Sequence, residues 1–267
     1  MNLLLSNDDG VFAAGIRALA QELKEYHNVA IVAPESQKSG ASHSMTSVHP
    51  VRVRTVTLPE LPDVPAFAVD GTPADCVRIG CTSLGLPVDM VVTGINHGAN
   101  LGSDVLYSGT VGAAMEGAFL GKQSFAASIY PDNPVDFSAA ARSALWTVDY
   151  IRRHPLPQGM ILSLNAPELP VPEIRGIRLC GLKLQQYKNT HVEYVDPYGM
   201  RFFWAPIEKI TECAPDEDTD ERYVRDGYVT LTPIHFDIAC YSYMRGMDVS
   251  DFDLSVLGLN KKISENI

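Results

Sequence analysis

The alternation of short apolar runs with stretches of helical period is the feature that most restricts the fold of this chain. Residues 2–6 and 28–33 are apolar runs, and Ile16, Leu19 and Leu23 recur at helical spacing between them, in a stretch from about Ala14 to Tyr26. The same alternation returns as apolar runs at 88–92, 124–129 and 160–164 and helical stretches at about 110–121 and 139–152. Because helices are the usual connections between parallel strands, we predict an α/β fold: a mostly parallel sheet with helices on both faces.

Two shorter runs and one capping pattern complete the predicted sheet. Residues 51–56 alternate apolar and charged side chains, which indicates a half-exposed strand, and residues 67–69 form a further short strand. Thr72 occupies the place of a helix N-cap, because Pro73 follows at the first helical position and Asp75 lies three residues after the cap.

The pattern changes after about Pro167, where proline-rich turns and β-type runs replace the alternation. Residues 185–194 and 200–205 flank the turn sequence DPYG at 196–199, which predicts a β-hairpin. We therefore expect a single domain over residues 1–267, with a core of about 1–167 and a C-terminal extension of about 168–267 that contains the hairpin and a tail.

Charge and cysteine content exclude several classes of protein. The formal net charge is −11 and no basic stripe is present, which argues against binding to a nucleic-acid polymer. No stretch approaches the roughly 18 apolar residues of a membrane-spanning helix. The five cysteines form no Cys-x-x-Cys pair and their number is odd, and the N-terminus has no signal-peptide pattern. These features predict a cytoplasmic protein without disulfides.

Three loops that follow predicted strands carry unusual polar residues. The first contains Asp8 and Asp9, the second contains Ser39 and Ser42, and the third contains Asn96 and Asn100. Ligands of open parallel sheets bind beyond the carboxyl ends of the strands. We therefore expect these loops to converge.

Adjacent carboxylates repel each other, so Asp8 and Asp9 indicate a cation nearby. Ser39 and Asn96 would add a hydroxyl and an amide oxygen, and such an all-oxygen set favours Mg²⁺ or Mn²⁺ over zinc. The sequence NDDG at 7–10 is equally compatible with an ordinary polar turn, and Ser39 and Asn96, taken singly, are compatible with loop-capping roles.

Ser108, Gly109 and Thr110 precede or open the helix predicted from about residue 110. Backbone N–H groups and hydroxyls at such a helix start can bind an anion, although an ordinary N-cap would have the same sequence. Ala118 stands where a P-loop requires lysine, so the segment is not a P-loop.

Other polar residues are weaker candidates. The acidic run at 216–220 lacks the glycine and the final glutamate of an EF-hand, so we expect a solvated acidic loop. His43 and His97 lie in the candidate loops, where either could donate a proton or bind phosphate, or have no role. No Gly-x-Ser-x-Gly sequence is present, which argues against a serine hydrolase.

The chain contains several sequence motifs, in the same order as in the family, that resemble SurE, the survival protein E family of metal-dependent 5′/3′-nucleotidases. They are LLSNDDG at 4–10, AP at 33–34 with SG at 39–40, VDGTPADCV at 69–77, GANLG at 98–102, SGTVGAA at 108–114, TD at 219–220 and GYVTLTP at 227–233. At 93–96 the chain has TGIN where the family usually has SGIN. The match covers most of the first 130 residues and a block near 219–233, whereas residues 131–217 are less distinctive.

The resemblance implies a Rossmann-like core and a homodimer or homotetramer with exchanged C-terminal elements. It implies one divalent metal ion per subunit, Mg²⁺ or Mn²⁺, with Asp8, Asp9, Ser39 and Asn96 as ligands, and nucleoside monophosphates as substrates. Activity on 3′-nucleotides and on short polyphosphate is a further family trait.

The expected reaction is attack of water on a phosphomonoester, with Asp9 or Asp8 orienting the water. Asn100 and residues 108–110 would hold the phosphate oxygens. Two alternatives stay open: a phosphatase in which Asp8 or Asp9 is the nucleophile, and a nucleotide sensor without enzymatic activity.

Overall fold

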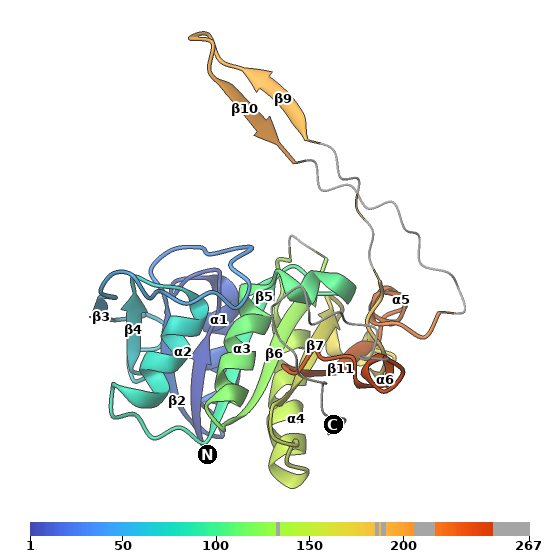
Figure 1. Ribbon diagram of the computed structural model, residues 1–267. Coiled ribbons are helices and arrows are strands. Elements are labelled where there is room, and N and C mark those ends of the chain that lie inside the picture. The colour runs from blue at the N-terminus through green and yellow to red at the C-terminus, as the bar shows by residue number, and fades with distance from the viewer. Residues whose placement is uncertain (132–133, 185–186, 188–190, 206–216, 248–267) are drawn as a thin grey trace, which may run out of the picture. The chain divides into compact units, whose positions relative to one another are not determined.

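The chain is described by a computed structural model that covers residues 1–131, 134–184, 187, 191–205 and 217–247 (Figure 1). Contacts divide the chain into two units, residues 1–236 and 237–267. The first unit contains a nine-stranded sheet in the order β3-β4-β2-β1-β5-β6-β7-β11-β8. Its strands are β1 (Asn2–Ser6), β2 (Asn28–Pro34), β3 (Val53–Val56), β4 (Ala66–Val69), β5 (Met90–His97), β6 (Gln123–Tyr130), β7 (Met160–Pro167), β8 (Ile177–Leu179) and β11 (Val229–His235).

The sheet is mostly parallel, as predicted. Strands β4, β2, β1, β5, β6 and β7 pair in parallel, whereas β3 pairs antiparallel with β4 and β11 antiparallel with β7. β8 pairs in parallel with β11 at the edge. In β1, Leu3, Leu4 and Leu5 are all buried, because helices cover both faces of the central strands. Burial of each such leucine is worth about 1.5–3 kcal/mol.

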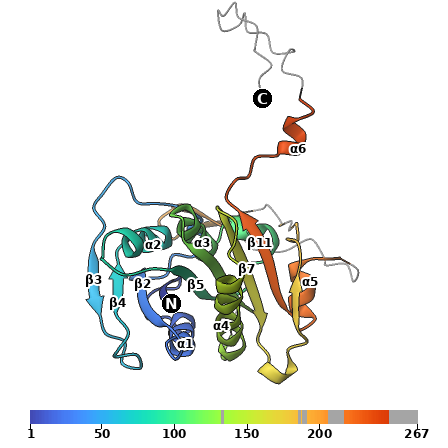
Figure 2. The ribbon, with the colours of Figure 1, turned by 90° about the horizontal axis from the view of Figure 1, so that it is seen from below.

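Helices cover both faces of the sheet, which also confirms the prediction (Figure 2). α1 packs against α4 on one face, and α2 packs against α3 on the other. The helices of the first unit are α1 (Ala14–Leu23), α2 (Pro73–Thr82), α3 (Gly109–Phe119), α4 (Ser138–Arg153) and α5 (Asp220–Arg225), with short 3-10 helices at Gly102–Leu106 and Val171–Glu173. The main core cluster joins α1 and α4 to the sheet, with members such as Leu19, Val148 and Phe125.

The predicted helix ends agree with the structure at most positions. Thr72 caps α2, and its hydroxyl accepts from the Asp75 N–H while the Asp75 carboxylate accepts from the Thr72 N–H. Gly121, with φ of +75°, follows the end of α3. α1 ends at Leu23, three residues before the predicted end at Tyr26, and the Tyr26 N–H turns back to the Leu23 carbonyl.

The predicted β-hairpin is also present, as a separate two-stranded sheet. β9 (Val192–Val195) pairs antiparallel with β10 (Arg201–Trp204), and the Asp196 N–H donates to the Met200 carbonyl across the turn. Residues 185–186 and 188–190 of the predicted first strand lie outside the described residues. The second unit contains α6 (Tyr241–Met244). None of the helices in the described part of the chain combines the length and apolar character needed to cross a bilayer.

Two local predictions were wrong. β5 does not end near Val92 but continues to His97, because Asn96 and His97 still pair with β6 after an irregularity that follows Thr93. The acidic run is not wholly a solvated loop: Asp220 opens α5 and is fully buried. In addition, β8, α5 and β11 come from the region expected as an extension, and both strands belong to the main sheet.

Candidate functional site

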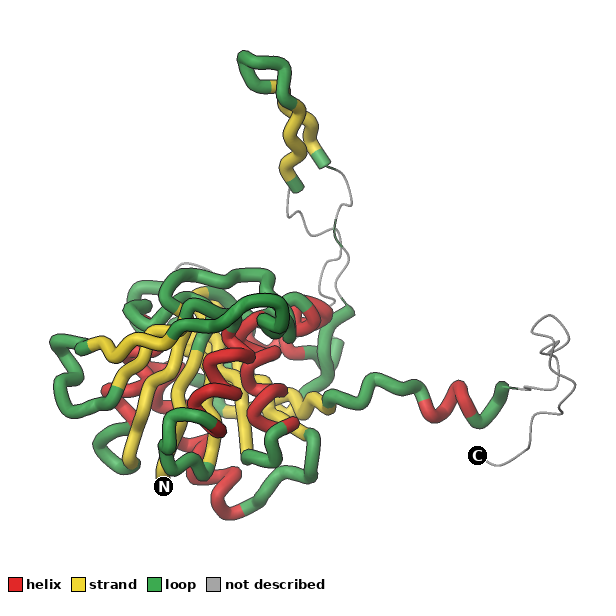
Figure 3. Tube along the Cα trace, turned by 60° about the vertical axis from the view of Figure 1, so that its left-hand side comes forward, coloured by secondary structure: helices red, strands yellow, loops and turns green. Residues whose placement is uncertain are grey.

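The candidate site lies at the carboxyl ends of the neighbouring strands β2, β1 and β5. These strands are parallel, so the loops that follow them leave the same edge of the sheet. Figure 3 shows loops over the edge that lies away from residue 1. The loop after β1 is a tight turn, in which Asn7 Nδ2 donates to the Gly10 carbonyl (3.0 Å) and Asn7 Oδ1 accepts from the Gly10 N–H (3.2 Å). Gly10 has φ of +105°, a value that favours glycine.

Asp8 is buried in this turn and contacts two other loops. Its Oδ1 accepts a hydrogen bond from the Thr110 hydroxyl at the start of α3. Its backbone carbonyl accepts from the Lys38 N–H (2.7 Å), so the loop after β2 lies directly against it. A Cβ added to Gly109 would lie 2.9 Å from Asp8 Oδ2. The start of α3 therefore packs closely against this carboxylate, and a larger residue than glycine at position 109 would displace one of the two.

Asp9 connects the first loop to the end of β5. Its Oδ2 accepts from the His97 N–H (3.0 Å), which places Asp9 beside the residue that follows Asn96. Asn96 is half-buried, and its Nδ2 donates to the Gly98 carbonyl (2.7 Å). That bond uses a donor of the side-chain amide and leaves its acceptor, Oδ1, for another partner.

Ser39 is the most exposed of the four predicted metal ligands. Its Oγ accepts from Gln37 Nε2 (2.9 Å), and the preceding residue, Lys38, is hydrogen-bonded to Asp8. Farther along the same loop, the Ser42 N–H donates to the Tyr107 carbonyl (3.0 Å) and the Ser42 hydroxyl to the Leu106 carbonyl (2.6 Å). The hydrogen bonds thus connect the first loop with the loop after β2, the end of β5 and the start of α3.

Burial governs the charge state of the two carboxylates. Burial raises the pKa of Asp8, and the Thr110 hydroxyl offsets part of the rise while the neighbouring Asp9 adds to it. Burial also raises the pKa of Asp9, against the lowering effect of the His97 N–H. Two adjacent carboxylates with raised pKa values, one buried and one half-buried, form a position where a cation is strongly favoured.

The donor atoms available at this edge fit a hard divalent cation. Asp8 Oδ2, Asp9 Oδ1, Asn96 Oδ1 and Ser39 Oγ are all oxygens, which is the ligand chemistry of Mg²⁺ and Mn²⁺. Among the described residues, no group of three or more His, Cys, Asp or Glu side chains is arranged to hold a metal ion. A cation here would therefore depend on amide and hydroxyl oxygens in addition to the two carboxylates.

The predicted phosphate-binding residues occupy the start of α3 and the loop before it. Ser108 is the N-cap of α3, and its Oγ accepts from the Val111 N–H (3.1 Å). Gly109 and Thr110 follow as the first helical residues, where backbone N–H groups point out of the helix. The Thr110 hydroxyl, however, is directed to Asp8, so Thr110 has a positioning contact that sequence reasoning did not anticipate.

Asn100 is held by residues that the sequence did not single out. Its N–H donates to Asn165 Oδ1 (2.9 Å), Asn165 Nδ2 donates back to the Asn100 carbonyl (3.1 Å), and Asn100 Nδ2 donates to the Ser128 hydroxyl (2.8 Å). Asn165 and Ser128 lie near the carboxyl ends of β7 and β6 and are buried. The only signal for them in the sequence is a polar residue inside an apolar strand.

The two loop histidines have protein partners. His97 Nε2 accepts from the Gly15 N–H (3.3 Å), and its ring packs against Phe137 with centroids 5.0 Å apart. His43 Nε2 lies 2.8 Å from an oxygen of Glu116, a buried carboxylate on α3 that also pairs with Arg78. Neither ring is hydrogen-bonded to an oxygen of the proposed ligand set.

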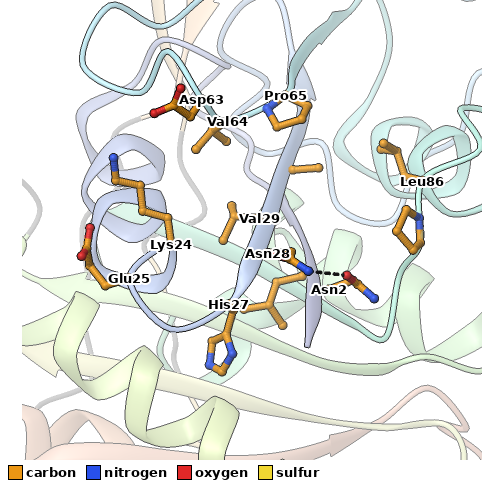
Figure 4. Close-up of a pocket in the computed structure, with 13 residues that line it drawn as sticks. Asn2, Lys24, Glu25, His27, Asn28, Val29, Asp63, Val64, Pro65 and Leu86 are labelled. Carbon is orange, nitrogen blue, oxygen red and sulfur yellow. Dashed lines mark hydrogen bonds between the residues drawn. The ribbon is translucent and has the colours of Figure 1, made fainter.

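A pocket at the opposite edge of the sheet is not the candidate site. It has a volume of about 520 Å³, and residues Asn2 and Asn28, which begin β1 and β2, line it together with Lys24, His27 and Asp63 (Figure 4). In open parallel sheets the amino ends of the strands are not the usual ligand edge.

Comparison with known proteins gives a consistent result. The family model described as survival protein SurE matches residues 3–189. A protein named 5′-nucleotidase SurE from Synechococcus sp. (strain JA-3-3Ab) is 42% identical over 245 residues, covering 91% of this chain and 94% of the relative. Another of that name, from Vibrio vulnificus (strain YJ016), is 42% identical over 252 residues, covering 93% and 94%.

A solved structure shows the same fold. The crystal structure of SurE protein from Aquifex aeolicus aligns with a TM-score of 0.80 and 38% identity, covering 92% of this chain and 98% of that one. The family match, the relatives and this structure together show that the chain belongs to the SurE family.

Proposed function

We propose that this chain is a metal-dependent phosphohydrolase that releases phosphate from nucleoside 5′-monophosphates. The observation that carries the proposal is the buried Asp8 carboxylate, which lies beside Asp9 and against the glycine at the start of α3. A cation-favouring carboxylate pair thereby adjoins a helix start that favours anions. The relatives named 5′-nucleotidase SurE support the choice of substrate.

Asp8, Asp9, Ser39 and Asn96 would hold one Mg²⁺ or Mn²⁺ ion per subunit. When bound, such an ion supplies Lewis acidity, which activates water for attack and offsets negative charge on the phosphate. Thr110 keeps the Asp8 carboxylate in one orientation, and the His97 N–H does the same for Asp9. These contacts pre-organise the carboxylates, which are otherwise costly to bring together.

Asn100, Ser108 and the backbone of Gly109 and Thr110 would hold the phosphate oxygens. Each donor directed at charge that develops in the transition state is worth about 2.7–4 kcal/mol. Asp9 is less buried than Asp8 and its carboxylate is therefore more accessible to water, so we assign Asp9 the orientation of the attacking water.

The hairpin supports assembly into a homodimer or homotetramer. Both of its strands expose large apolar side chains, and Trp204 (70% exposed) and Val195 (60%) are the most exposed of them. A two-stranded hairpin of this kind is at most marginally stable in water by itself, and exposed apolar patches mark interaction sites.

We also place the protein in the cytoplasm, because the four described cysteines are free thiols.

The test is a phosphate-release assay with purified protein on nucleoside 5′- and 3′-monophosphates and on tripolyphosphate, in Mg²⁺, Mn²⁺ and EDTA. We expect release from 5′-monophosphates that stops in EDTA, and no release in any arm would contradict the proposal. Acid-quenching a reaction that is turning over ³²P-labelled substrate separates direct water attack from an aspartyl-phosphate route, because only the latter leaves labelled phosphate bound to the protein. The 3′ and tripolyphosphate arms define the substrate range.

A further inference from the structure

We propose that Asp220 is a positioning residue for the loop at 100–108, which carries the proposed phosphate-binding residues Asn100 and Ser108. Asp220 couples this loop to the chain segment that leads to the hairpin. The inference rests on the proposed function, because it assigns Asn100 and Ser108 to phosphate binding. It concerns a carboxylate far from Asp8 in the sequence, in a segment that the sequence suggested would be solvated.

Asp220 joins three separate parts of the chain through backbone N–H groups. Its Oδ2 accepts from the Gly102 N–H (2.7 Å), and its Oδ1 accepts from the Lys183 N–H (3.0 Å) and the Glu221 N–H (2.9 Å). Its own N–H donates to the Gly181 carbonyl (2.9 Å). The loop that contains Asn100, the segment that begins at Gly181 and helix α5 therefore meet at one side chain.

The environment of this carboxylate is unusual for a surface helix of an acidic protein. Asp220 is fully buried, and no described lysine or arginine side chain forms an ion pair with it. Burial raises its pKa, and the N–H groups of Gly102, Lys183 and Glu221 offset part of that rise. An uncompensated buried charge is costly, so the hydrogen bonds from the two distant segments are what maintain it as an acceptor.

A second set of contacts reinforces the same connection. The Ser103 N–H donates to the Lys183 carbonyl (3.1 Å), and the Tyr187 hydroxyl donates to Asp104. Residues 183 and 187 thus hold the 3-10 helix at Gly102–Leu106 from one side. The next described part of the chain after residue 187 begins at residue 191, just before β9 of the hairpin.

The tethered 3-10 helix lies between the two groups of proposed phosphate ligands. Asn100 precedes it by two residues and is fixed on its other side by Asn165. After it, the Asp104 carbonyl accepts from the N–H groups of Tyr107 (2.9 Å) and Ser108 (3.2 Å). Displacement of Gly102 would therefore move Asn100 and Ser108 without a direct change to either side chain.

The test compares Asp220→Asn with Glu168→Gln in the full-length protein. Asparagine has the same size as aspartate but replaces one acceptor oxygen with a donor, which faces an N–H group. Glu168 is a half-buried carboxylate that accepts from the N–H groups of Val135 (2.6 Å) and Asp136 (2.8 Å), and neither belongs to the candidate site. Glu168→Gln is thus a matched loss of a carboxylate that binds backbone N–H groups.

For Asp220→Asn we expect KM for a nucleoside 5′-monophosphate and the inhibition constant for inorganic phosphate to rise by about 10-fold or more, since a 1 Å misplacement costs about 100-fold. Glu168→Gln should keep both constants within about twofold. Hydrogen exchange should increase in residues 100–108 and around Lys183 but not in β1 or α1. A role confined to global stability would instead lower the melting temperature and raise exchange throughout, with KM unchanged.

Tyr187→Phe provides a second, milder perturbation in case Asp220→Asn does not fold. It removes one hydroxyl contact to Asp104 and should change KM in the same direction by a smaller factor. An inactive wild-type protein would overturn the proposed function and this inference with it. If the wild type is active, unchanged KM and phosphate inhibition in the folded Asp220→Asn variant would overturn the inference alone. If only Tyr187→Phe folds, unchanged constants in that variant would overturn it.

Discussion

Gly109→Ala is the substitution that tests the geometry around Asp8 most simply. An alanine Cβ at this position would lie 2.9 Å from both Asp8 Oδ2 and Asp8 Cβ, and 3.2 Å from Pro73 Cγ. Ordinary contacts between such atoms are about 3.5 Å, so Asp8 or the start of α3 must move by about 0.5 Å. Asp8 is buried and bonded to Thr110, so the movement changes the position of the carboxylate relative to Asp9.

The substitution should lower activity as well as stability. Alanine is favoured over glycine in a helix by up to about 1 kcal/mol, which partly offsets the steric cost. A catalytic group has to be held within about 0.5 Å of its productive position, and a 1 Å error costs about 100-fold. We therefore expect kcat/KM to fall by roughly 10-fold or more, with a similar loss of Mn²⁺ affinity and a loss of stability of no more than about 1–3 kcal/mol.

Gly117→Ala is the control on the same helix. Its Cβ would lie 2.8 Å from Ser124 Oγ and 2.9 Å from Val91 Cβ, a contact equally tight but away from Asp8. Overpacking of this kind costs about 1–3 kcal/mol, so this variant should lose stability and keep its kcat/KM. The assays are phosphate release, calorimetric Mn²⁺ titration and thermal unfolding. Equal kcat/KM for Gly109→Ala and the wild type would refute the placement of Asp8 in the reactive centre.

Three further predictions concern the carboxylates and the hairpin. Asp8→Asn should lower turnover by orders of magnitude, and near-normal turnover would contradict the assignment. It should also raise the melting temperature of the metal-free protein at neutral pH. The reason is that the native pKa of Asp8 is raised, so its ionised form destabilises the native state. Mn²⁺ affinity should rise with pH through the raised pKa values of Asp8 and Asp9, since the ion must displace their protons, and calorimetry that finds no difference between acid and neutral pH would count against both ligands. Trp204→Glu should lower the molar mass in light scattering by disrupting contacts between hairpins, whereas an unchanged assembly would argue that the hairpin is not the contact.

The fold was predictable because the pattern that encodes it is local. Apolar runs such as residues 2–6 and the helical spacing of Ile16, Leu19 and Leu23 determine element type without reference to distant residues. The alternation of these elements then implies the parallel sheet. The extension of β5 to His97 was missed because its last residues are fixed by pairing with β6, which is a tertiary contact.

The candidate site was predictable only in part. The position of Asp8 and Asp9 after the first strand indicated the edge of the sheet, and the hydrogen bonds of Asp8, Asp9 and Ser42 show that the loops meet there. The identity of the metal ligands stays a prediction. The supporting residues Asn165 and Asp220 were not identifiable from spacing, because each acts on a residue 65 or more positions away.

The most direct test of the metal site is anomalous diffraction from crystals of the protein grown with Mn²⁺. The account predicts one strong anomalous peak per subunit, with oxygen atoms of Asp8, Asp9, Ser39 and Asn96 about 2.2 Å from it. A peak bound by other residues, or none at this edge of the sheet in protein that hydrolyses nucleotides, would contradict it.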